Sequence, residues 1–561
     1  MNRSSVGPLV KLAETVKVFA RNAPSPRELL ANRTQRFDRY HAILPSTTTP
    51  GTTLSLTVQV WDQCERLYRD FDGTLGLDTT DPEADHPRTI AIEPPNDGVA
   101  KLDGVEFVTP GVQYLILRDQ QTDERFVSNP VRVRADGERN HGVYWGDIHL
   151  HSIHSDGTGE AERGYRFGRD VMDLDVVAYT DHDTMGFFIP PQWQRRRMHR
   201  EYFDRLCALA ETFNEDGKFV TLPAYEWTKQ PNMGGHINVY FEDSVDATLF
   251  DSLTAGTNTY EQLWDRLRDW DEQHDTGVVT IPHHPAEAMY PFDFADVAYD
   301  DDLAPLVEVY SQWGSSEYPG RDGNEFPLAM GQGEIDEAGH YVQDAHRMGY
   351  KVGMIGGADF HGPYPGHSII HTRPHLPSFQ EWRRNGLGWG NIWRVWDEQS
   401  YPGGLTAFLA PELSREAIFA ALRSRSVYAT TQPDRMLVDF RVNGVDVATQ
   451  DDAVVVDTPE TSREITVDVA GTAPIATVTV TKNNTAWRRI DGTDDPNADL
   501  DSYTLSGEWT DDAPVTGMAW DERRQTDGDV YTVRVRQASR DRYPGMAWVG
   551  PIWVEASNTM A

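Results

Sequence analysis

The chain has little cysteine and no long apolar run, and each absence excludes some classes of protein. Its two cysteines, Cys64 and Cys207, lie far apart and form neither a CxxC pair nor a disulfide framework, which is typical of a reducing cytoplasm. No run approaches the roughly 18 consecutive apolar residues of a membrane helix. Lys11 and Lys17 interrupt the apolar N-terminal stretch, as in an amphipathic helix rather than a signal peptide. We therefore expect a cytoplasmic protein that does not bind membranes.

Lysine is also scarce. It supplies seven of the 51 basic residues, whereas aspartate and glutamate total 88, so the net charge is −37. The acid excess is spread along the chain, and self-repulsion on this scale destabilises a compact state unless salt screens it. A GC-rich genome would also replace lysine by arginine but would not explain the acid excess, so we favour halophilic adaptation. The charge argues against nucleic-acid binding, which needs a basic surface, but it permits an anionic substrate beside metal ions.

The pattern of apolar residues divides the chain into four regions. Residues 1–32 look helical. Alternating strands broken by turns predict one β-sandwich over 33–138 and a second over 433–561. Over 139–432, apolar strands alternate with helical stretches such as Arg197–Phe213 and SREAIFAALRSR, which predicts parallel strands joined by crossover helices. The predicted class is α/β, with a central domain between two sandwiches.

Histidines and carboxylates gather at the ends of successive predicted strands of the central region. In chain order they are His149, His151, Asp181, His182, Asp183, Glu226, His236, His283, His284, Glu308, Asp359 and His361. In a βα-barrel the C-terminal ends of the strands meet around one mouth, so these groups would lie together. A single HxH or DxH pair is more often a surface or core pair than a ligand pair. Its recurrence at strand after strand favours a cluster that holds two or three metal ions.

The motifs HLHSIHSDG, TDHD, ADFH and the pair His284–Pro285, with the strand-end Glu226, resemble the PHP superfamily of polymerase-associated and histidinol-phosphatase domains. YVQDAHRMGYKVGMIGGADFHGPYPG, SREAIFAALRSRSVYATT and AWVGPIWVE resemble one large branch of it, catalogued as a domain of unknown function with flanking β-sandwich regions. The resemblance implies a distorted (β/α)7 TIM-like barrel that holds two or three Mn, Zn or Fe ions and hydrolyses phosphoesters. It does not fix the substrate.

The resemblance also implies nine metal ligands. One ion would be held by His149, His151, Glu226 and Asp359; a second by Glu226, His236 and His284; and a third by Asp156, His182 and His361. Some relatives have a histidine in place of Asp156, and a carboxylate there can favour a harder metal such as Mn or Fe. For His236 the alternative is a hydrogen-bonding strand residue.

Four further residues are candidates for catalytic support. Asp147 and Asp181 would orient histidine rings, or would only cap strand ends. His283 and His154 are candidate proton donors for a leaving group. Because adjacent strand residues face opposite ways, we expect His283 to lie behind the ligand His284.

Six residues near predicted strand ends are candidates for substrate binding, although packing at the rim explains each equally well. They are Trp227, Lys229, Gln230, Trp313, Arg425 and Tyr428.

Three functions remain open from the sequence. The first is a metal-dependent phosphoesterase that acts on small phosphomonoesters or diesters through a metal-bridging hydroxide. The second is a metallohydrolase of a lactone, ester or amide, which stays open because no arginine cluster is evident at the strand ends. The third is a scaffold or adhesion protein with a degenerate barrel, which the full ligand set argues against. We expect a small-molecule substrate in the first two cases, and the sequence leaves the oligomeric state open.

Overall fold

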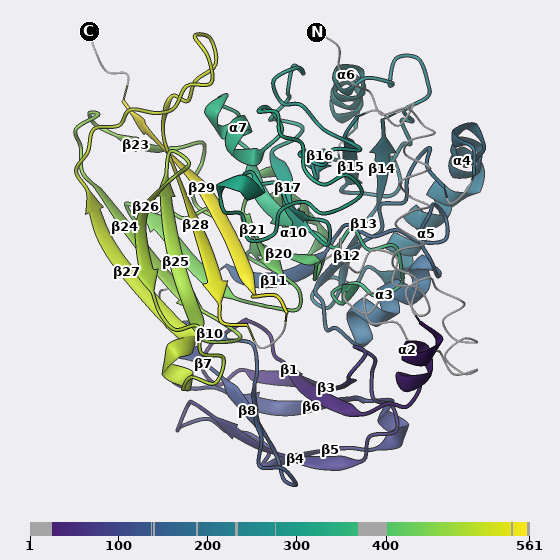
Figure 1. The fold of residues 1–561 in the computed structure, drawn as a ribbon, viewed down its shortest axis with the longest axis vertical. Helices are drawn as coiled ribbons and strands as arrows, with labels where there is room; N and C mark the ends of the chain where they lie inside the picture. Colours follow the sequence, from purple (N-terminus) through teal and green to yellow (C-terminus); the bar gives the residue numbers. More distant parts are fainter. Residues whose placement is uncertain are drawn as a thin grey trace.

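The computed structural model describes residues 25–135, 137, 141–186, 189–229, 234–274, 276–368, 401–539 and 542–557. It is a mixed α/β protein in which sheets dominate (Figure 1). Of the helical segment predicted over 1–32, residues 1–24 lie outside the described residues, and helix α2 spans Pro26–Ala31.

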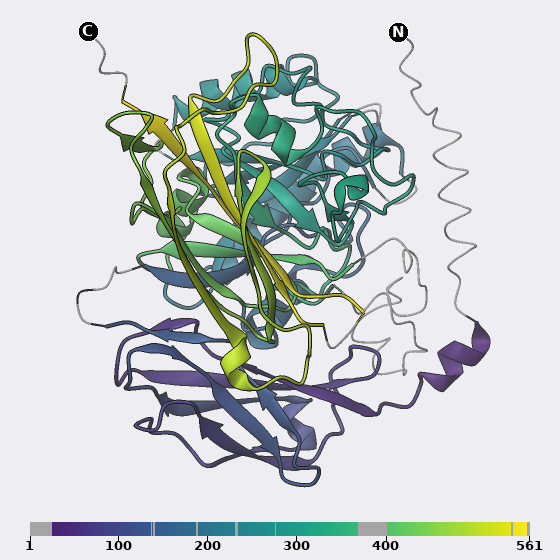
Figure 2. The same cartoon turned by 60° about the vertical axis from the view of Figure 1, so that its left-hand side comes forward.

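The N-terminal region folds as small sheets around one apolar core, and Figure 2 shows them as a layer beneath the rest of the molecule. The strands are β1 (Phe37–Ile43), β2 (Thr47–Thr48), β3 (Thr53–Asp62), β4 (Gly73–Thr79), β5 (Thr89–Ile92), β6 (Val99–Glu106), β7 (Gly111–Gln113), β8 (Leu115–Asp119), β9 (Arg125–Val127) and β10 (Val131–Val133). Alternation places one face of each strand inward, as Leu75 and Leu77 of β4 show. These sheets are sandwich-like.

A ten-stranded sheet links the central and C-terminal regions. Its order is β13 (Val220–Leu222), β12 (Val176–Ala178), β11 (Gly142–Asp147), β20 (Gly404–Ala410), β21 (Val427–Thr431), β29 (Met546–Ala556), β28 (Gly528–Gln537), β25 (Ile475–Lys482) and β26 (Thr485–Asp491), with β23 (Val454–Val456) paired to β29. Strands β22 (Leu437–Val442), β24 (Arg463–Ala470) and β27 (Thr504–Asp511) form a separate sheet. Since Ala429 pairs with Trp548, the boundary predicted after residue 432 falls within one continuous sheet.

A six-stranded sheet holds the other central strands. It contains β14 (Ala224–Thr228), β15 (His236–Phe241), β16 (Val278–His283), β17 (Leu306–Ser311) and β18 (Gly314–Ser315) in that order, and β19 (Gly353–Gly356) pairs with β17. The expectation of parallel strands is wrong for β14, β15 and β16, which pair antiparallel. Seven residues separate β14 from β15, too few for the crossover of a dozen or more that parallel neighbours need.

In the part of the chain that the structure describes, helices are few, and those other than α2 lie beside the central strands (Figure 1). They are α3 (Ala161–Asp170), α4 (Pro191–Arg197), a π-helical turn (Met198–Tyr202), α5 (Phe203–Phe213), α6 (Tyr260–Asp271), α7 (Val342–Arg347) and α10 (Arg415–Arg423), with 3₁₀ turns at Pro94–Asn96, Gly320–Asp322 and Leu500–Tyr503. The helices predicted in SREAIFAALRSR and before Phe213 are confirmed. Ser414 caps α10 by accepting the Ala417 N–H. Within the described ranges, no helix combines the length and apolar character that a membrane crossing requires.

Two isolated bridges join the central sheets at the ends that carry the predicted ligands. Leu150 pairs with Phe360, beyond the ends of β11 and β19, and His182 pairs with Glu226 of β14. The segments that follow β11, β12 and β19 therefore meet β14 at one place.

Candidate metal centre

The structure brings all nine predicted ligands together at this meeting point. They are His149, His151, Asp156, His182, Glu226, His236, His284, Asp359 and His361, and the geometry adds His283. Their ligand atoms form overlapping groups in which the atoms lie within 4.8 Å of one another. Such groups of imidazole nitrogens and carboxylate oxygens could hold metal ions.

Glu226 lies at the centre of the buried part of the cluster, which we call the closed part. Its Oε2 atom is 3.1 Å from Nε2 of His149 and 3.2 Å from Nε2 of His151, and its Oε1 atom is 2.6 Å from Nδ1 of His236. Oδ1 of Asp359 approaches the same two Nε2 atoms at 3.5 and 3.2 Å. These side chains are almost fully buried.

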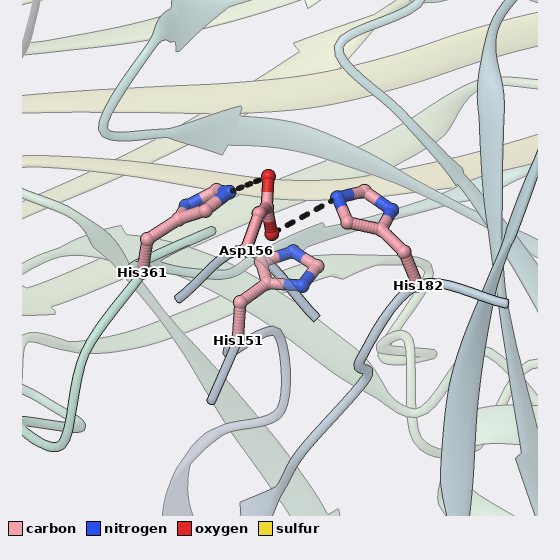
Figure 3. A group of neighbouring side chains, drawn as sticks. All are labelled: His151, Asp156, His182 and His361. Carbon is pink, nitrogen blue, oxygen red and sulfur yellow. Dashed lines mark ion pairs between the residues drawn. The ribbon is translucent and has the colours of Figure 1, made fainter. Parts of the chain in front are cut away.

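His151, Asp156, His182 and His361 form a more open part of the cluster (Figure 3). The carboxylate of Asp156 stands between two rings, with Oδ2 3.4 Å from Nε2 of His361 and Oδ1 3.6 Å from Nε2 of His182. The side chains of His361 and Asp156 retain 30% and 17% exposure, so solvent reaches the cluster from this side.

His283 and His284 both face the cluster, contrary to the expectation that their rings point opposite ways. Strand β16 ends at His283, and His284 has a φ of 35°, so the alternation of a strand does not continue to it. The two ring centroids lie 4.2 Å apart, and both residues group with His236.

Buried ligand atoms that make no hydrogen bond indicate which kind of group the cluster could bind. Within the described residues, nine ring nitrogens and carboxylate oxygens of the cluster are buried and make no hydrogen bond of good geometry, although some of them lie at ion-pair distance from another ligand. They are His151 Nδ1 and Nε2, Asp156 Oδ1, His182 Nε2, Glu226 Oε1, His236 Nε2, His283 Nδ1 and Nε2, and His284 Nδ1. A buried polar atom without a hydrogen bond costs about 1–3 kcal/mol of folding free energy. Because so many of them lie in one place, the cluster is suited to bound cations. The mixed nitrogen and oxygen donors suit Zn, Mn or Fe.

The electrostatics of the cluster favour positive charge. Burial raises the pKa of Glu226, but the neighbouring His182, His283 and His236 rings hold that pKa well below its usual value. Burial also lowers the pKa of His151, yet Asp359 and Glu226 raise it to about 10. Burial lowers the pKa of His283 to about 4, so this ring gives up its proton easily and can then ligate. The site therefore offers ionised carboxylates and a field that attracts a cation.

Within the described residues, the hydrogen bonds of Asp147 and Asp181 go to backbone, amide and hydroxyl groups and not to histidine rings, which agrees with the alternative that they cap strand ends. Asp147 accepts the N–H groups of Ala358 and Gly366. Asp181 accepts hydrogen bonds from the backbone N–H and hydroxyl of Ser152. They fix the segments that carry ligands instead of touching a ring.

Glu308 and Trp313 hold ligand side chains in place, and sequence reasoning assigned neither this role. Glu308 faces Nδ1 of His149 at 2.9 and 3.1 Å. The indole N–H of Trp313 donates to Oδ2 of Asp359 at 2.7 Å, so this residue supports a ligand. A lone glutamate in the apolar stretch LVEVYS was the available signal for Glu308.

His154, Trp227 and Tyr428 are buried and contact groups other than the predicted ligands. His154 is 3% exposed and packs against Tyr202, so it does not line an open mouth. Trp227 is fully buried and donates to the Thr257 carbonyl, as a core residue does. Tyr428 is also buried and donates to the Met436 carbonyl.

Arg425 and Lys229 make contacts that do not involve ligands. The Arg425 side chain lies against Gly353, at the opposite end of β19 from Asp359, and donates to the Lys351 carbonyl. Lys229 donates to the Asn258 carbonyl beside Trp227. Gln230 lies outside the described residues.

A family model described as "Protein of unknown function (DUF3604)" matches residues 168–303 and 340–491, just over half of the chain. The chain belongs to this family. The match covers six of the nine predicted ligands.

The DUF3604 protein has curated relatives in Chlamydia, all named as uncharacterized. The Chlamydia pneumoniae relative is 25% identical over 467 residues, and the Chlamydia trachomatis relative 24%. Each alignment covers 82% of this chain and 65% of the relative, so the chain spans slightly less than two thirds of their length. A solved two-domain protein from Bacteroides vulgatus, said to contain a predicted PHP-like metal-dependent phosphoesterase, is 14% identical; the match covers 75% of this chain and 98% of that one, with a TM-score of 0.33.

Proposed function

We propose that this DUF3604 protein is a metal-dependent hydrolase that cleaves phosphomonoesters or diesters of small molecules. The observation that carries the proposal is the cluster of nine buried ligand atoms that make no hydrogen bond, beside a side that solvent reaches. When bound, two or three Mn, Zn or Fe ions would activate water and neutralise charge that develops on a phosphoryl oxygen. The motif resemblance to PHP enzymes supports the phosphoester as the bond cleaved.

The chain's own groups would do the positioning. Glu226 and Asp359 supply carboxylate ligands, and the histidines supply neutral nitrogens once a cation replaces their protons. We also propose that β11, β12, β14–β17 and β19 form the ring of a distorted (β/α)7 barrel. The Leu150–Phe360 and His182–Glu226 bridges support it, because they join the two sheets on either side of the ligands.

A second candidate is a hydrolase of a lactone, ester or amide. It is favoured by one observation: within the described residues, no lysine or arginine forms an ion pair with any ligand of the cluster. Arginine is often recruited to bind phosphate, and an ion pair with a ligand would have placed one beside the ions. A scaffold role is less consistent with a ligand set that is complete.

The test is hydrolysis of p-nitrophenyl phosphate, bis-p-nitrophenyl phosphate and p-nitrophenyl acetate by protein loaded with Mn or Zn in molar KCl. We expect turnover of a phosphate ester that is lost in Glu226→Gln and retained in Glu317→Gln, a buried glutamate outside the cluster that pairs with Arg534. Turnover of the acetate alone would establish the second candidate. No turnover by metal-loaded protein would refute both enzymatic functions.

A further inference from the structure

We propose that Gln312 is a positioning residue of the metal centre: it holds the backbone of Asp359 so that the Asp359 carbonyl fixes the His361 ring for the ion of the open part. The proposal rests on the metal ions of the proposed function and does not depend on which bond is cleaved. It gives one residue, Asp359, a part in binding two ions.

The ligand Asp359 has a left-handed backbone conformation. Its φ is 50°, although it is not a glycine. A side chain disfavours this conformation, so it persists only where surrounding contacts hold it, and residues of this kind cluster at functional sites. The contacts that hold the Asp359 backbone therefore also determine where this ligand lies.

Gln312 and Trp313 hold Asp359 at two different points. Gln312 follows the last residue of β17, and its Nε2 group donates to the Asp359 carbonyl. The backbone N–H of Gln312 donates to the Ala358 carbonyl at 3.2 Å. The indole N–H of Trp313 donates to Oδ2 of the Asp359 side chain at 2.7 Å. Gln312 thus fixes the backbone of this ligand, and Trp313 fixes its carboxylate.

The Asp359 carbonyl also orients the ring of His361. It lies 3.0 Å from Nδ1 of that ring. Because a carbonyl can only accept, the proton of a neutral His361 ring resides on Nδ1. Nε2 is then left with its lone pair, 3.4 Å from Oδ2 of Asp156, where the ligand atoms of the open part converge. This is the tautomer that a metal ligand needs.

Asp359 therefore serves both parts of the cluster. Its Oδ1 atom faces Nε2 of His149 and of His151 at 3.5 and 3.2 Å in the closed part. Its carbonyl acts on the open part through His361. The side chain and the backbone of one residue thus contribute to two groups of ligands.

Loss of the Gln312 donor should affect the open part most. Without it, the Asp359 backbone can relax toward an ordinary φ, which moves the carbonyl away from Nδ1 of His361. The His361 side chain is 30% exposed, so protein surrounds only part of the ring and restrains it less than a buried ligand. The Asp359 carboxylate, in contrast, is still held by Trp313.

The burial of Gln312 supports a role in the metal centre over a role in stability. The residue is 2% exposed, and among the residues that the structure describes its Oε1 atom finds no hydrogen-bond donor. A buried polar atom without a hydrogen bond costs folding free energy. An apolar side chain of similar size would avoid this cost, but it could not donate to the Asp359 carbonyl.

Gln312→Met tests the proposal because methionine has a similar length and no N–H donor. Wild type and variant are loaded with Zn, and release to a chromogenic chelator is followed by stopped flow. The phase that Asp156→Asn removes belongs to the open part. We expect this phase to be about 10-fold faster in Gln312→Met, the lower end of the effect of losing a group that orients a ligand ring, because the carbonyl itself remains. Release from the closed part should match that of wild type.

Three further variants separate a positioning role from a general loosening of the protein. Gln312→Leu also lacks a donor and should behave like Gln312→Met. Gln450→Met is the matched control, since Gln450 is buried and its Nε2 donates to the Pro551 carbonyl at 2.9 Å, away from every ligand. It should leave both phases unchanged. Trp313→Phe should instead accelerate release from the closed part, because it frees the Asp359 carboxylate.

The outcomes distinguish this role from the function on which it rests. Equal acceleration of both phases in the two Gln312 variants, or of neither phase, would overturn the role of Gln312. Acceleration of the closed phase alone would overturn it as well. A wild type that binds no Zn would instead overturn the proposed function.

Discussion

The carboxylate of Glu308 approaches Nδ1 of His149 with both of its oxygens, at 3.1 and 2.9 Å, and both side chains are buried. Because a carboxylate can only accept, the proton of a neutral His149 ring resides on Nδ1. Nε2 is then left with its lone pair toward Glu226 and Asp359, which is the orientation that a metal ligand needs. Glu308 thus selects the tautomer that can bind an ion.

Replacing Glu308 by Gln should therefore weaken metal binding. We expect the affinity for Mn or Zn, measured by equilibrium dialysis or calorimetry, to fall about 10–100-fold, because loss of such a partner loosens the ring and lowers its basicity. Glu317→Gln is the control: Glu317 is also buried, but it pairs with Arg534 and Trp548 and touches no ligand. Equal affinities in Glu308→Gln and wild type would contradict this role.

Trp313→Phe separates two roles for Trp313. Phe keeps an aromatic ring but loses the N–H that donates to Asp359 at 2.7 Å. If the indole positions the ligand, metal affinity should fall about 10–100-fold, since a hydrogen bond to a charged group contributes about 1.5–3 kcal/mol. If Trp313 instead binds substrate, as the sequence suggested, KM would rise while metal affinity stays unchanged.

Most of the ligands could be predicted from sequence because histidines and carboxylates recur at the ends of predicted strands, and the resemblance to the PHP superfamily supplied the complete set, including Asp156. Their supports could not. Glu308 orients His149 from a strand 159 residues away, and nothing local in LVEVYS specifies that partner. Asp147 looked like a ring-orienting carboxylate from its i, i+2 spacing to His149, but its oxygens are taken by backbone N–H groups of a distant loop.

The fold also combines features that short stretches of sequence predict with features that depend on residues far apart in the chain. Strand and helix positions follow from periodicity, as α10 does. Strand direction depends on partners, and the short link before β15 makes an antiparallel hairpin within a region whose overall alternation suggested parallel strands. The pairing of Ala429 with Trp548, which carries one sheet across the expected domain boundary, joins segments too distant for any sequence window.

Metal removal should occur in two phases. The open part of the cluster, with Asp156 and His361 partly exposed, should release its ion to a chelator faster than the closed part around Glu226. Stopped-flow chelation with a chromogenic reagent measures the phases. Asp156→Asn should abolish the fast phase and lower the metal content by one ion. Asp183→Asn, a buried carboxylate that binds the Thr228 and Ser252 N–H groups, should keep both phases. A single phase in wild type would contradict two unlike sites.

Salt should stabilise the protein if its acid excess is an adaptation to high salt. With a net charge of −37, self-repulsion is large at low ionic strength, and the screening length falls from about 10 Å at 0.1 M to about 3 Å at 1 M. We expect Tm to rise steeply between 0.1 and 1 M KCl. Sucrose at equal osmolality, which stabilises by exclusion and not by screening, should raise Tm less. A Tm that is independent of KCl would contradict adaptation to high salt.

Mild acid should destabilise the protein through His346, which lies far from the metal cluster. Its buried ring contacts the Val352 carbonyl through Nε2 at 3.0 Å, and burial lowers its pKa from 6.5 to about 4. Between these values the unfolded chain binds a proton that the folded chain does not, so stability falls as pH falls from about 6.5 toward 4 and is fully present above 6.5.

From pH 7 to pH 5 this one group should cost about 2 kcal/mol of unfolding free energy. His346→Gln keeps a donor for the Val352 carbonyl but cannot titrate. Urea unfolding of both proteins at the two pH values, in one salt concentration, gives the comparison. The variant should lose less stability than wild type over this interval by about that amount. Equal losses in the two proteins would mean that the folded state accommodates a charged His346.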